Sequence, residues 1–128
     1  MEEEAITTFD SYVDDHVSPH FLFSEFACHD GSEHPIAVGL IAILEAVRAR
    51  FGPVKITSGY RSASYNEKIG GVKNSYHVKG MAADIQVEGR EPKEVFQWID
   101  SKFPDCGLGL YRTFVHVDCR SQRARWER

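Results

Sequence analysis

Two segments of the chain alternate polar and apolar residues in the way that a half-buried β-strand does. In residues 82–88 (AADIQVE), polar side chains occupy every second position from Asp84 onward. In residues 114–119 (FVHVDC), His116 and Asp118 alternate with valines. Successive side chains of a strand point to opposite faces of a sheet, so each segment has one polar and one apolar face. The chain therefore needs a sheet whose apolar face is covered by other elements.

Two amphipathic helices are expected to provide that cover. Over residues 36–51 apolar side chains recur at intervals of three and four, and Gly52-Pro53 ends the pattern. A second helix is expected over 92–103, because a proline stands at its start, where a helix tolerates it. The other expected elements are a helical turn capped by Ser24, a strand over 54–58, a short helix between Ser62 and Gly70-Gly71, a loop to Gly80 and a strand over 107–111. This order predicts an α+β fold, with a small, mostly antiparallel sheet and helices packed on one side.

Length and charge narrow the class of protein. With 128 residues, 42% of them hydrophobic, the chain is long enough for one core, so we expect an N-terminal arm over 1–20 and a single domain over 21–128. The arm is acidic and is expected to be extended or to form a short helix. A net charge of −4 argues against a broad phosphate-neutralising surface and hence against a nucleic-acid partner. The arginines within residues 120–128 are interpreted as a solvated basic terminus, and a monomer is expected.

Signals that direct a chain to a membrane or out of the cell are not recognised in the sequence. No run approaches the ~18 apolar residues of a membrane span. The start, MEEEAITTF, has neither the basic nor the apolar region of a signal peptide. We therefore expect a product that stays in the cytoplasm until release, as a phage lysin does, or a domain of a longer precursor that acts in the periplasm or outside the cell.

The cysteines favour reduced thiols. Cys28, Cys106 and Cys119 are too widely spaced for CxxC chemistry and too few for a disulfide framework, although a single bridge stays open as an alternative. Cys28 lies close to His29 and His34 in the sequence, but no fourth ligand is spaced to complete a metal site with them. We interpret these residues as structural.

Three residues stand out as candidate metal ligands, namely His77, Asp84 and His116. Two imidazoles and one carboxylate form a donor set that zinc accepts, and they leave a fourth tetrahedral position open for water. Such an open position is typical of a catalytic zinc site. Ordinary hydrogen bonds would satisfy the same side chains equally well, so spacing alone leaves both interpretations open.

A series of short motifs in a fixed order adds to this pattern. The motifs run from about residue 21 to residue 126 and are FSEFAC, SGYRS, Asn66, the GG pair at 70–71, SYHVKGMAADI, GLGLY, FVHVD and a final RW. Together they resemble the zinc D-Ala-D-Ala carboxypeptidase family, whose relatives include bacterial murein peptidases and phage endolysins. Several motifs in the correct order are far more specific than any one of them.

The resemblance implies the Hedgehog/DD-peptidase fold, with a zinc ion (Zn2+) held by His77, Asp84 and His116. It implies that Arg61 faces the cleft and binds a carboxylate or carbonyl of the peptidoglycan stem peptide. Ser75 is expected to hydrogen-bond the substrate or to cap its loop. The implied activity is hydrolysis of peptide bonds in stem peptides or cross-links by a zinc-activated water, as a carboxypeptidase or an endopeptidase.

One position departs from the family pattern. Many members carry a glutamate or aspartate three residues before the last zinc histidine, where this chain has Thr113, and a threonine does not take a proton near neutral pH. Either another group such as Asp118 handles the proton, or activity is reduced or lost; Asp118 is equally suited to orient a zinc histidine. The competing class of function is a catalytically weakened module that binds cell wall or serves as a virion component. Tyr60 and Tyr111 are interpreted as packing residues, with cleft walls or proton donors as the alternative.

Overall fold

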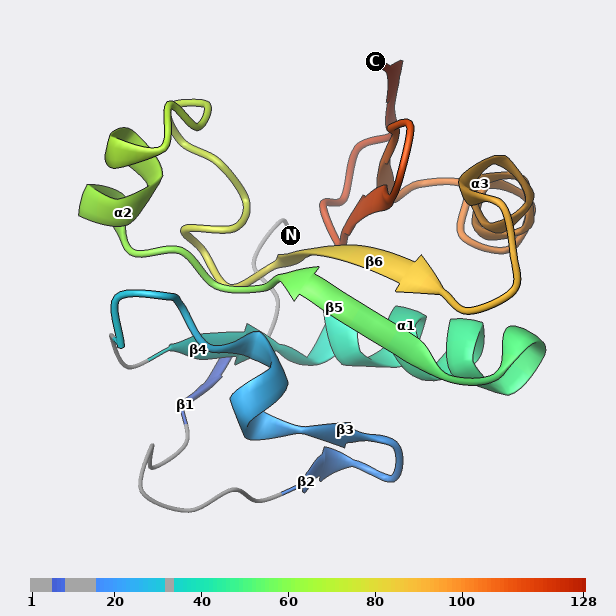
Figure 1. Ribbon diagram of the computed structural model, residues 1–128, viewed down its shortest axis with the longest axis horizontal. Coiled ribbons are helices and arrows are strands. Elements are labelled where there is room, and N and C mark those ends of the chain that lie inside the picture. Colours follow the sequence, from blue (N-terminus) through green and yellow to red (C-terminus); the bar gives the residue numbers. More distant parts are fainter. Residues whose placement is uncertain (1–5, 9–15, 32–33) are drawn as a thin grey trace.

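A five-stranded sheet with the strand order β5-β6-β8-β7-β9 forms the centre of the protein (Figure 1). The computed structural model describes residues 6–8, 16–31 and 34–128. The strands of this sheet are β5 (Val54–Ser58), β6 (Ala82–Val87), β7 (Gly107–Leu110), β8 (Val115–Asp118) and β9 (Ala124–Glu127). Neighbouring strands are antiparallel except for β7 and β9, which run parallel. The expected α+β fold with a mostly antiparallel sheet is confirmed.

Helices α1 (Val38–Phe51) and α3 (Pro92–Lys102) pack against the apolar face of this sheet. The alternation seen in the sequence has the expected consequence, because Ala83, Ile85 and Val117 are fully buried in the core beneath the helices. The two helices meet through the rings of Phe51 and Trp98, whose centroids are 5.6 Å apart. Burying a side chain of the size of Ile85 stabilises the fold by roughly 1.5–3 kcal/mol. The buried side chains of the sheet and of the two helices belong to one core.

The opposite face of the sheet is polar and carries the candidate site. Asp84 of β6 lies directly opposite His116 of β8 in the antiparallel register. On its other side, Asp84 is paired with Ser58 of β5, after an irregularity in the ladder between Ile56 and Ser58. Directly paired residues project to the same face of a sheet, so the register alone brings the Asp84 and His116 side chains together.

The short helix α2 (Ala63–Lys68) follows β5 and begins as the sequence predicts. Ser62 Oγ accepts the backbone N–H of Tyr65 at 3.1 Å, which is the hydrogen bond of a helix N-cap. The helix ends before Gly70, whose φ of 75° is in the left-handed region that glycine adopts without strain. Both the cap and the glycine ending are confirmed.

The first long helix starts two residues later than the sequence predicts. Ile36 lies in the strand β4 (Pro35–Ala37), which pairs with β1 (Ile6–Thr8), and α1 begins only at Val38. Ala37 donates its backbone N–H to the Gly80 carbonyl at 2.9 Å and is thereby held extended. These hydrogen bonds to distant segments outweigh the helical period at this end. A backbone group that bonds outside the helix is not available for a hydrogen bond within it.

The expected N-cap at Ser24 is wrong. The 3-10 helix η1 (Phe23–Phe26) begins two residues earlier, because its N-cap position is Leu22. Glu25 Oε2 accepts the Leu22 N–H at 2.6 Å, so an acidic side chain inside the turn supplies the capping acceptor. The aromatic side chains of this region, Phe21, Phe23 and Phe26, are buried in the core as expected.

The basic C-terminal segment is not a solvated terminus, because it forms β9 beside β7. Arg125 donates from Nε to Asp100 Oδ1 at 2.6 Å and from Nη1 to the Cys106 carbonyl, so its charge is used within the fold. Trp126 lies against Gly109, where an added Cβ would be only 2.3 Å from the indole Nε1. The strand was hidden in the sequence because four residues are too few to show a period among so many arginines.

The described part of the N-terminal region is extended. Residues 6–8 form β1, and β2 (His16–Ser18) pairs with β3 (Phe21–Leu22). Ser18 Oγ donates to Glu45 Oε2 at 2.5 Å, which ties β2 to α1. The alternative of a short helix is wrong for residues 6–8 and 16–18, and the rest of this expectation lies outside the described residues. The division into an arm and a domain stays a prediction.

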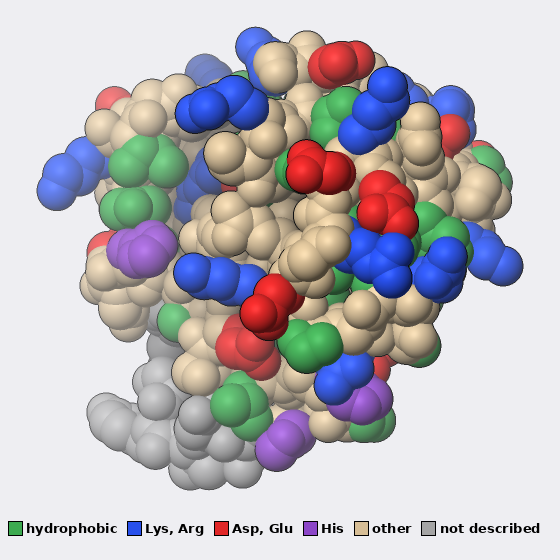
Figure 2. All heavy atoms as spheres, turned by 45° about the vertical axis from the view of Figure 1, so that its right-hand side comes forward, with side chains coloured by type: hydrophobic (Ala, Val, Ile, Leu, Met, Phe, Trp, Pro, Cys, Tyr) green, Lys and Arg blue, Asp and Glu red, His purple; other side chains and the backbone are tan. Residues whose placement is uncertain are grey.

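The described surface carries mixed charge. On the face shown in Figure 2, Lys and Arg side chains are interspersed with Asp and Glu over the part drawn in colour. That part of the face therefore lacks the continuous basic surface with which proteins neutralise a phosphate backbone. Among the described residues, no helix has both the length and the apolar composition needed to cross a membrane.

All three cysteines are free and buried, as expected for reduced thiols. Burial raises the pKa of Cys106 to about 11, although the nearby Arg125 guanidinium opposes the shift. Because the thiolate is the nucleophile, Cys106 is protected both by its surroundings and by its protonation state near neutral pH.

We predict that the native protein reacts slowly with a chromogenic disulfide reagent at pH 8. The initial rate should be about 100-fold or more below that of the unfolded chain, the factor that a local opening free energy of ~3 kcal/mol imposes. Unfolding in guanidinium chloride should release three thiol equivalents, one for each free cysteine. Cys106→Ser should leave the native rate unchanged; a fast native equivalent that disappears in this variant would contradict the prediction.

Candidate metal centre

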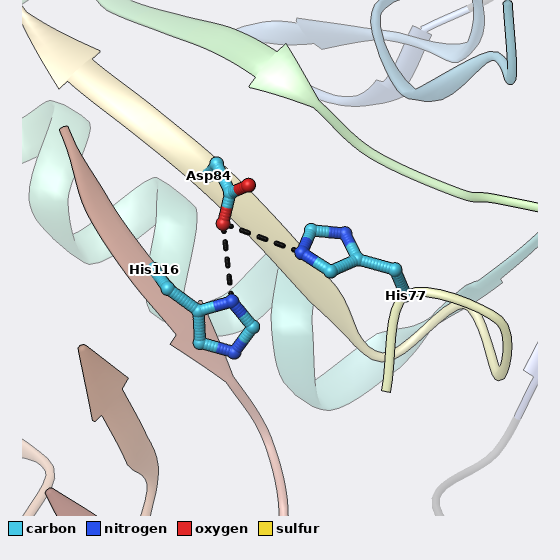
Figure 3. Close-up of side chains that lie close together, drawn as sticks. All are labelled: His77, Asp84 and His116. Atoms are coloured by element: carbon cyan, nitrogen blue, oxygen red, sulfur yellow. Dashed lines mark hydrogen bonds and ion pairs between the residues drawn. The ribbon is translucent and has the colours of Figure 1, made fainter. Parts of the chain in front are cut away.

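His77, Asp84 and His116 meet on the polar face of the sheet (Figure 3). Asp84 Oδ1 lies 3.3 Å from His77 Nε2 and 3.0 Å from His116 Nδ1. One atom from each of the three residues lies within 4.8 Å of the others, and all three side chains are buried. The structure thus brings together the three residues that the sequence marks as metal ligands.

Each of the three side chains comes from a different element. Asp84 and His116 face each other across β6 and β8, whereas His77 lies in the loop that precedes β6. The Arg61 N–H and the Gly80 N–H both donate to the His77 carbonyl, at 3.1 and 3.2 Å. Gly80 has a φ of 72°, and a Cβ there would be 2.5 Å from the Pro35 carbonyl oxygen. A glycine is therefore required for the tight turn that returns the chain from His77 to β6.

Hydrogen bonds fix which nitrogen of each imidazole faces Asp84. His77 Nδ1 lies 2.7 Å from the Gly59 carbonyl oxygen, which only accepts, so Nδ1 carries the hydrogen and Nε2 is directed at Asp84. His116 Nε2 lies 2.8 Å from Asp118 Oδ2, an ionised acceptor, so Nε2 carries its hydrogen and Nδ1 is directed at Asp84. An imidazole whose outer nitrogen donates to a carbonyl or carboxylate is the usual arrangement of a metal-ligating histidine.

The electrostatics of the cluster require a positive charge beside Asp84. Burial alone would raise the pKa of this carboxyl, but its polar contacts with His116 and His77 outweigh burial and hold the pKa well below its usual range. Asp84 is therefore ionised. Burial would lower the pKa of His116, but its hydrogen bonds to Asp118 and Asp84 raise it. Arg61 supplies one positive charge at Asp84 Oδ2, at 3.5 Å. At Asp84 Oδ1, either an imidazolium at His116 or a cation shared with the imidazole lone pairs completes the cluster.

The donor set fits a divalent metal ion. Two imidazole nitrogens and one carboxylate oxygen converge from three sides, each outer hydrogen-bonding position of the rings is occupied, and the fourth side faces a cavity. These are the features of an open metal site, with three protein ligands and one position for water or substrate. The chemistry available to such a site is Lewis-acid activation of water or of a carbonyl.

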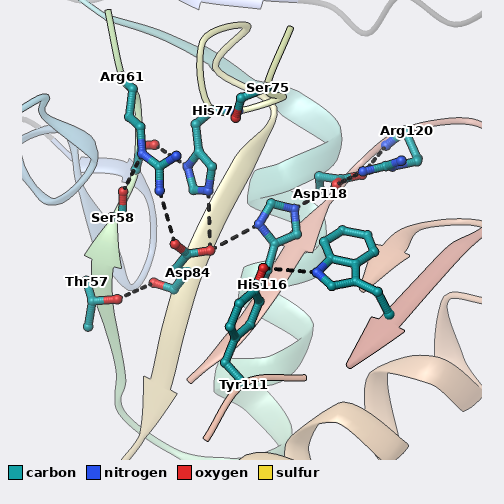
Figure 4. A network of polar contacts seen from close by, with 12 residues as sticks. Thr57, Ser58, Arg61, Ser75, His77, Asp84, Tyr111, His116, Asp118 and Arg120 are labelled. Carbon is teal, nitrogen blue, oxygen red and sulfur yellow. Dashed lines mark hydrogen bonds and ion pairs between the residues drawn. The ribbon is translucent and has the colours of Figure 1, made fainter. Parts of the chain in front are cut away.

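Asp118 lies behind His116, on the side away from Asp84 (Figure 4). Its two oxygens accept Arg120 Nε at 2.8 Å and Arg120 Nη2 at 2.7 Å, and the side chain has no exposed surface. Burial would raise its pKa, but the hydrogen bonds from Arg120 and His116 keep the pKa well below its usual range. A Cβ at Gly107 would be 2.3 Å from Asp118 Oδ1, so the ion pair of Asp118 and Arg120 requires a glycine at this position of β7. The geometry fits an orienting role for Asp118.

Arg61 and Ser75 border the same site. Arg61 donates to Ser58 Oγ and to Asn66 Oδ1, both at 3.2 Å, and to Asp84 Oδ2 at 3.5 Å. The guanidinium therefore supports the carboxylate oxygen that does not face the imidazoles. Ser75 Oγ accepts the His77 N–H at 3.1 Å and caps the loop, one of the two roles expected for it. Contact of either residue with a substrate stays a prediction.

A cavity of about 400 Å³ opens in front of the three candidate ligands. Besides these ligands, its lining includes Arg61, Ser75, Tyr76, Tyr111, Phe114, Arg120, Trp126 and Arg128. Sequence analysis missed the part of Arg120, which carries no motif of its own, and treated Trp126 only as the end of the motif series. Trp126 becomes a neighbour of His116 through the pairing of β7 with β9, whereas Arg120 reaches the site through its two hydrogen bonds to Asp118.

Thr113 is turned away from this cavity. It is exposed, its carbonyl accepts Gln86 Nε2 at 2.9 Å, and it lines a separate cavity with Gln86 and Val115. Within the described lining of the metal-facing cavity, Asp84 is the only acidic side chain. The position at which many relatives carry an acid therefore provides no side chain to the reaction space of this chain.

Sequence comparison identifies the family. The sequence profile of peptidase M15 matches residues 19–118. The chain belongs to the peptidase M15 family. This membership confirms the resemblance to zinc D-Ala-D-Ala carboxypeptidases and murein endopeptidases, and M15 peptidases are metallopeptidases, in accord with the His77, Asp84 and His116 cluster.

Two curated relatives of this M15 chain carry the name MepK. The probable peptidoglycan L,D-endopeptidase MepK of Haemophilus influenzae is 38% identical over 76 residues, which cover 54% of this chain and 40% of the relative. The peptidoglycan L,D-endopeptidase MepK of Escherichia coli strain K12 is 37% identical over 73 residues, which cover 52% of this chain and 40% of the relative. The match thus spans about two fifths of the length of these relatives.

We predict that His77→Ala, Asp84→Ala and His116→Ala each abolish binding of one equivalent of a divalent metal ion. Removing one of three converging donors leaves too few ligands for a stable site. Metal content after equilibration and gel filtration measures the loss, and His29→Ala, at an exposed histidine outside the cluster, is the matched control. Full metal content in any one of the three variants would remove that residue from the ligand set.

Proposed function

We propose that this M15 chain is a zinc-dependent peptidase that hydrolyses peptide bonds of peptidoglycan, in stem peptides or in the cross-links between them. The observation that carries the proposal is the convergence of two imidazole nitrogens on Asp84 Oδ1, at 3.0 and 3.3 Å, in front of a cavity. Membership of the M15 family supports peptide hydrolysis. The relatives named as L,D-endopeptidases support peptidoglycan as the substrate and favour an endopeptidase over a carboxypeptidase.

Zinc is the metal that suits this donor set best, because it accepts two imidazoles and one carboxylate in a tetrahedral arrangement. When bound, zinc would supply a water of lowered pKa and would polarise the scissile carbonyl. The chain's own contribution is to hold the donors in one orientation. The Gly59 carbonyl fixes His77, the Asp118 carboxylate fixes His116, and Arg61 holds the second oxygen of Asp84.

Arg61 is proposed to contact the substrate in addition to Asp84. A guanidinium has five N–H donors, and the hydrogen bonds to Ser58, Asn66 and Asp84 use three of them. The remaining donors suit a carbonyl or carboxylate of the stem peptide. Because Arg61 is held in place by these three bonds, it is already oriented before substrate arrives, which reduces the entropy lost on binding.

Asp118 is proposed as a positioning residue and not as the proton carrier. A group that moves the proton has to reach the water or the leaving amine within hydrogen-bond distance. Asp118 has no exposed surface, and its oxygens are already bonded to Arg120 and His116. It acts on the reaction through His116, whose ring it holds in the orientation that presents Nδ1.

A weakened module that binds cell wall without cleaving it is the second candidate. It is favoured by one observation, namely that Asp84 is the only acidic side chain in the described lining of the cavity. Peptide-bond hydrolysis without a general acid or base is slower by typically ~10²–10⁴-fold. The two candidates differ in turnover and agree in metal binding.

We predict that the zinc-loaded protein releases new amino groups from purified peptidoglycan and that mass spectrometry of the muropeptides shows one type of peptide bond cleaved. Asp84→Ala should be inactive because a ligand is lost, and His29→Ala should retain full activity. If the wild-type protein binds zinc stoichiometrically and sediments with peptidoglycan but releases no amine, the peptidase is excluded and the binding module is supported.

We predict that Asp118→Asn lowers zinc affinity by roughly 10–100-fold, the usual effect of removing a partner that orients a ligating histidine. Stoichiometry at saturating zinc should be unchanged, since no ligand is removed. Competition with a chromogenic chelator measures the affinity. Asp100→Asn is the matched control, because Asp100 also pairs with arginines, at 2.6 and 3.0 Å, but belongs to α3 and is not part of the lining of the metal-facing cavity. Equal affinities of Asp118→Asn and Asp100→Asn would contradict the orienting role.

A further inference from the structure

Tyr111 lines the metal-facing cavity, whereas Thr113 lines a separate one. Tyr111 follows β7 directly and lines the cavity together with Asp84 and His116. Figure 4 shows its ring running towards His116 and Asp84, with the phenol oxygen at the inner end. The only other tyrosine in the described lining of this cavity, Tyr76, instead lies under two cations, with Lys79 Nζ 4.6 Å and Arg120 Cζ 4.3 Å from its ring centre.

The hydrogen bond between Trp126 and Tyr111 does not use the Tyr111 hydroxyl hydrogen, which can therefore be donated to a ligand. Trp126 Nε1 lies 3.0 Å from the Tyr111 oxygen, and an indole N–H is a donor only. The phenol oxygen therefore accepts in this bond, and its own hydrogen is not used in it. A phenol holds its hydrogen and its best acceptor position on opposite sides of the C–O bond in the ring plane. The Trp126 bond thus directs the hydroxyl hydrogen away from the indole and into the cavity.

Three contacts keep this hydroxyl in place. The Tyr111 ring stacks on Phe114 with centroids 4.3 Å apart and an interplanar angle of 10°. The Tyr111 N–H donates to the Phe114 carbonyl at 3.0 Å, which closes the turn between β7 and β8. Trp126 is itself fixed, because it lies beside Gly109 in the parallel pairing of β7 and β9. A donor that is positioned before the substrate arrives costs no reorganisation when charge develops.

Other polar groups near the candidate ligands also make hydrogen bonds within the fold. Arg120 is paired through two hydrogen bonds with Asp118, and Ser75 Oγ accepts from the His77 N–H. Arg61 has donors left, but its guanidinium is held at the Asp84 side, next to Ser58. Tyr111 is on the opposite side of the candidate ligands, next to Trp126 and His116. A carbonyl in the cavity would therefore meet a donor on each side.

We propose that Tyr111 is a catalytic residue that donates its phenol hydrogen bond to the scissile carbonyl oxygen as this oxygen gains negative charge. The inference rests on the peptidase function proposed above. The proton stays on Tyr111 throughout, so the phenol stabilises charge and no covalent bond to it forms or breaks. Trp126 is the positioning residue for this donor.

The test compares Tyr111→Phe with the wild type and with Tyr65→Phe, which loses the same hydroxyl on α2, outside the cavity lining. For Tyr111→Phe, kcat on peptidoglycan should fall by about 10²-fold, the usual effect of deleting one donor to a developing oxyanion, whereas KM should change by less than about 2-fold. Zinc affinity should be unchanged, and Tyr65→Phe should match the wild type. A rise in KM at constant kcat, or a loss of zinc affinity, would assign Tyr111 to binding or to the metal site and overturn the proposal.

A second measurement separates this inference from the proposed function. Acetohydroxamate presents an anionic oxygen to a bound zinc ion and does not depend on recognition of a peptide. Its affinity for the zinc-loaded protein should fall by about 10-fold in Tyr111→Phe and by a smaller factor in Trp126→Phe, which keeps the aromatic packing but loses the orienting N–H. If the wild type cleaves no peptidoglycan but this affinity falls, only the peptidase function fails. If the affinity is equal in wild type and Tyr111→Phe, the role of Tyr111 is excluded whatever the activity.

Discussion

The pairing of Asp84 with His116 across β6 and β8 is the constraint on which the rest of the site depends. A slip of one residue in this register would turn the carboxylate into the core and place Ile85 in the cavity, because side chains alternate between the two faces of a sheet. Burying an unpaired carboxylate costs several kcal/mol, and exposing Ile85 costs roughly another 1.5–3 kcal/mol. The pattern that buries the core is therefore the same pattern that assembles the metal donors.

A second layer of contacts fixes the orientation of these donors, and much of it comes from distant parts of the chain. Gly59, at the end of β5, holds His77; Asp118 holds His116. Arg120 holds Asp118 in turn, and its guanidinium is 5.4 Å from the ring centre of Trp126 on β9. The site is thus built from backbone and side-chain groups of several segments that are separate in the sequence. Loss of any of these outer contacts is expected to change metal affinity more than metal stoichiometry.

The sequence predicted the sheet, the long helices and the three candidate ligands because each depends on a local period or on a short motif. Asp84 and His116 were grouped by their donor chemistry and by the series of motifs, and the structure adds their direct pairing across β6 and β8. The β9 strand, the start of α1 and the parts of Arg120 and Trp126 were not recognisable. These features depend on which strands lie next to each other, and no local pattern records the order β8-β7-β9. The expected cap at Ser24 was wrong for a local reason. Serine is a common N-cap residue, but here the Glu25 carboxylate accepts the Leu22 N–H.

The two glycines of β7 make the site sensitive to substitutions outside its ligands. Gly107 leaves the space that Asp118 and Arg120 fill, and Gly109 leaves the space for the Trp126 indole. Alanine at either position would push on a group that supports His116 or Tyr111 without altering a single ligand. Substitutions in β7 are therefore expected to be rare among natural variants of this chain, although β7 has no functional side chains of its own. A Gly→Ala change there would impair the metal centre without replacing any of its ligands.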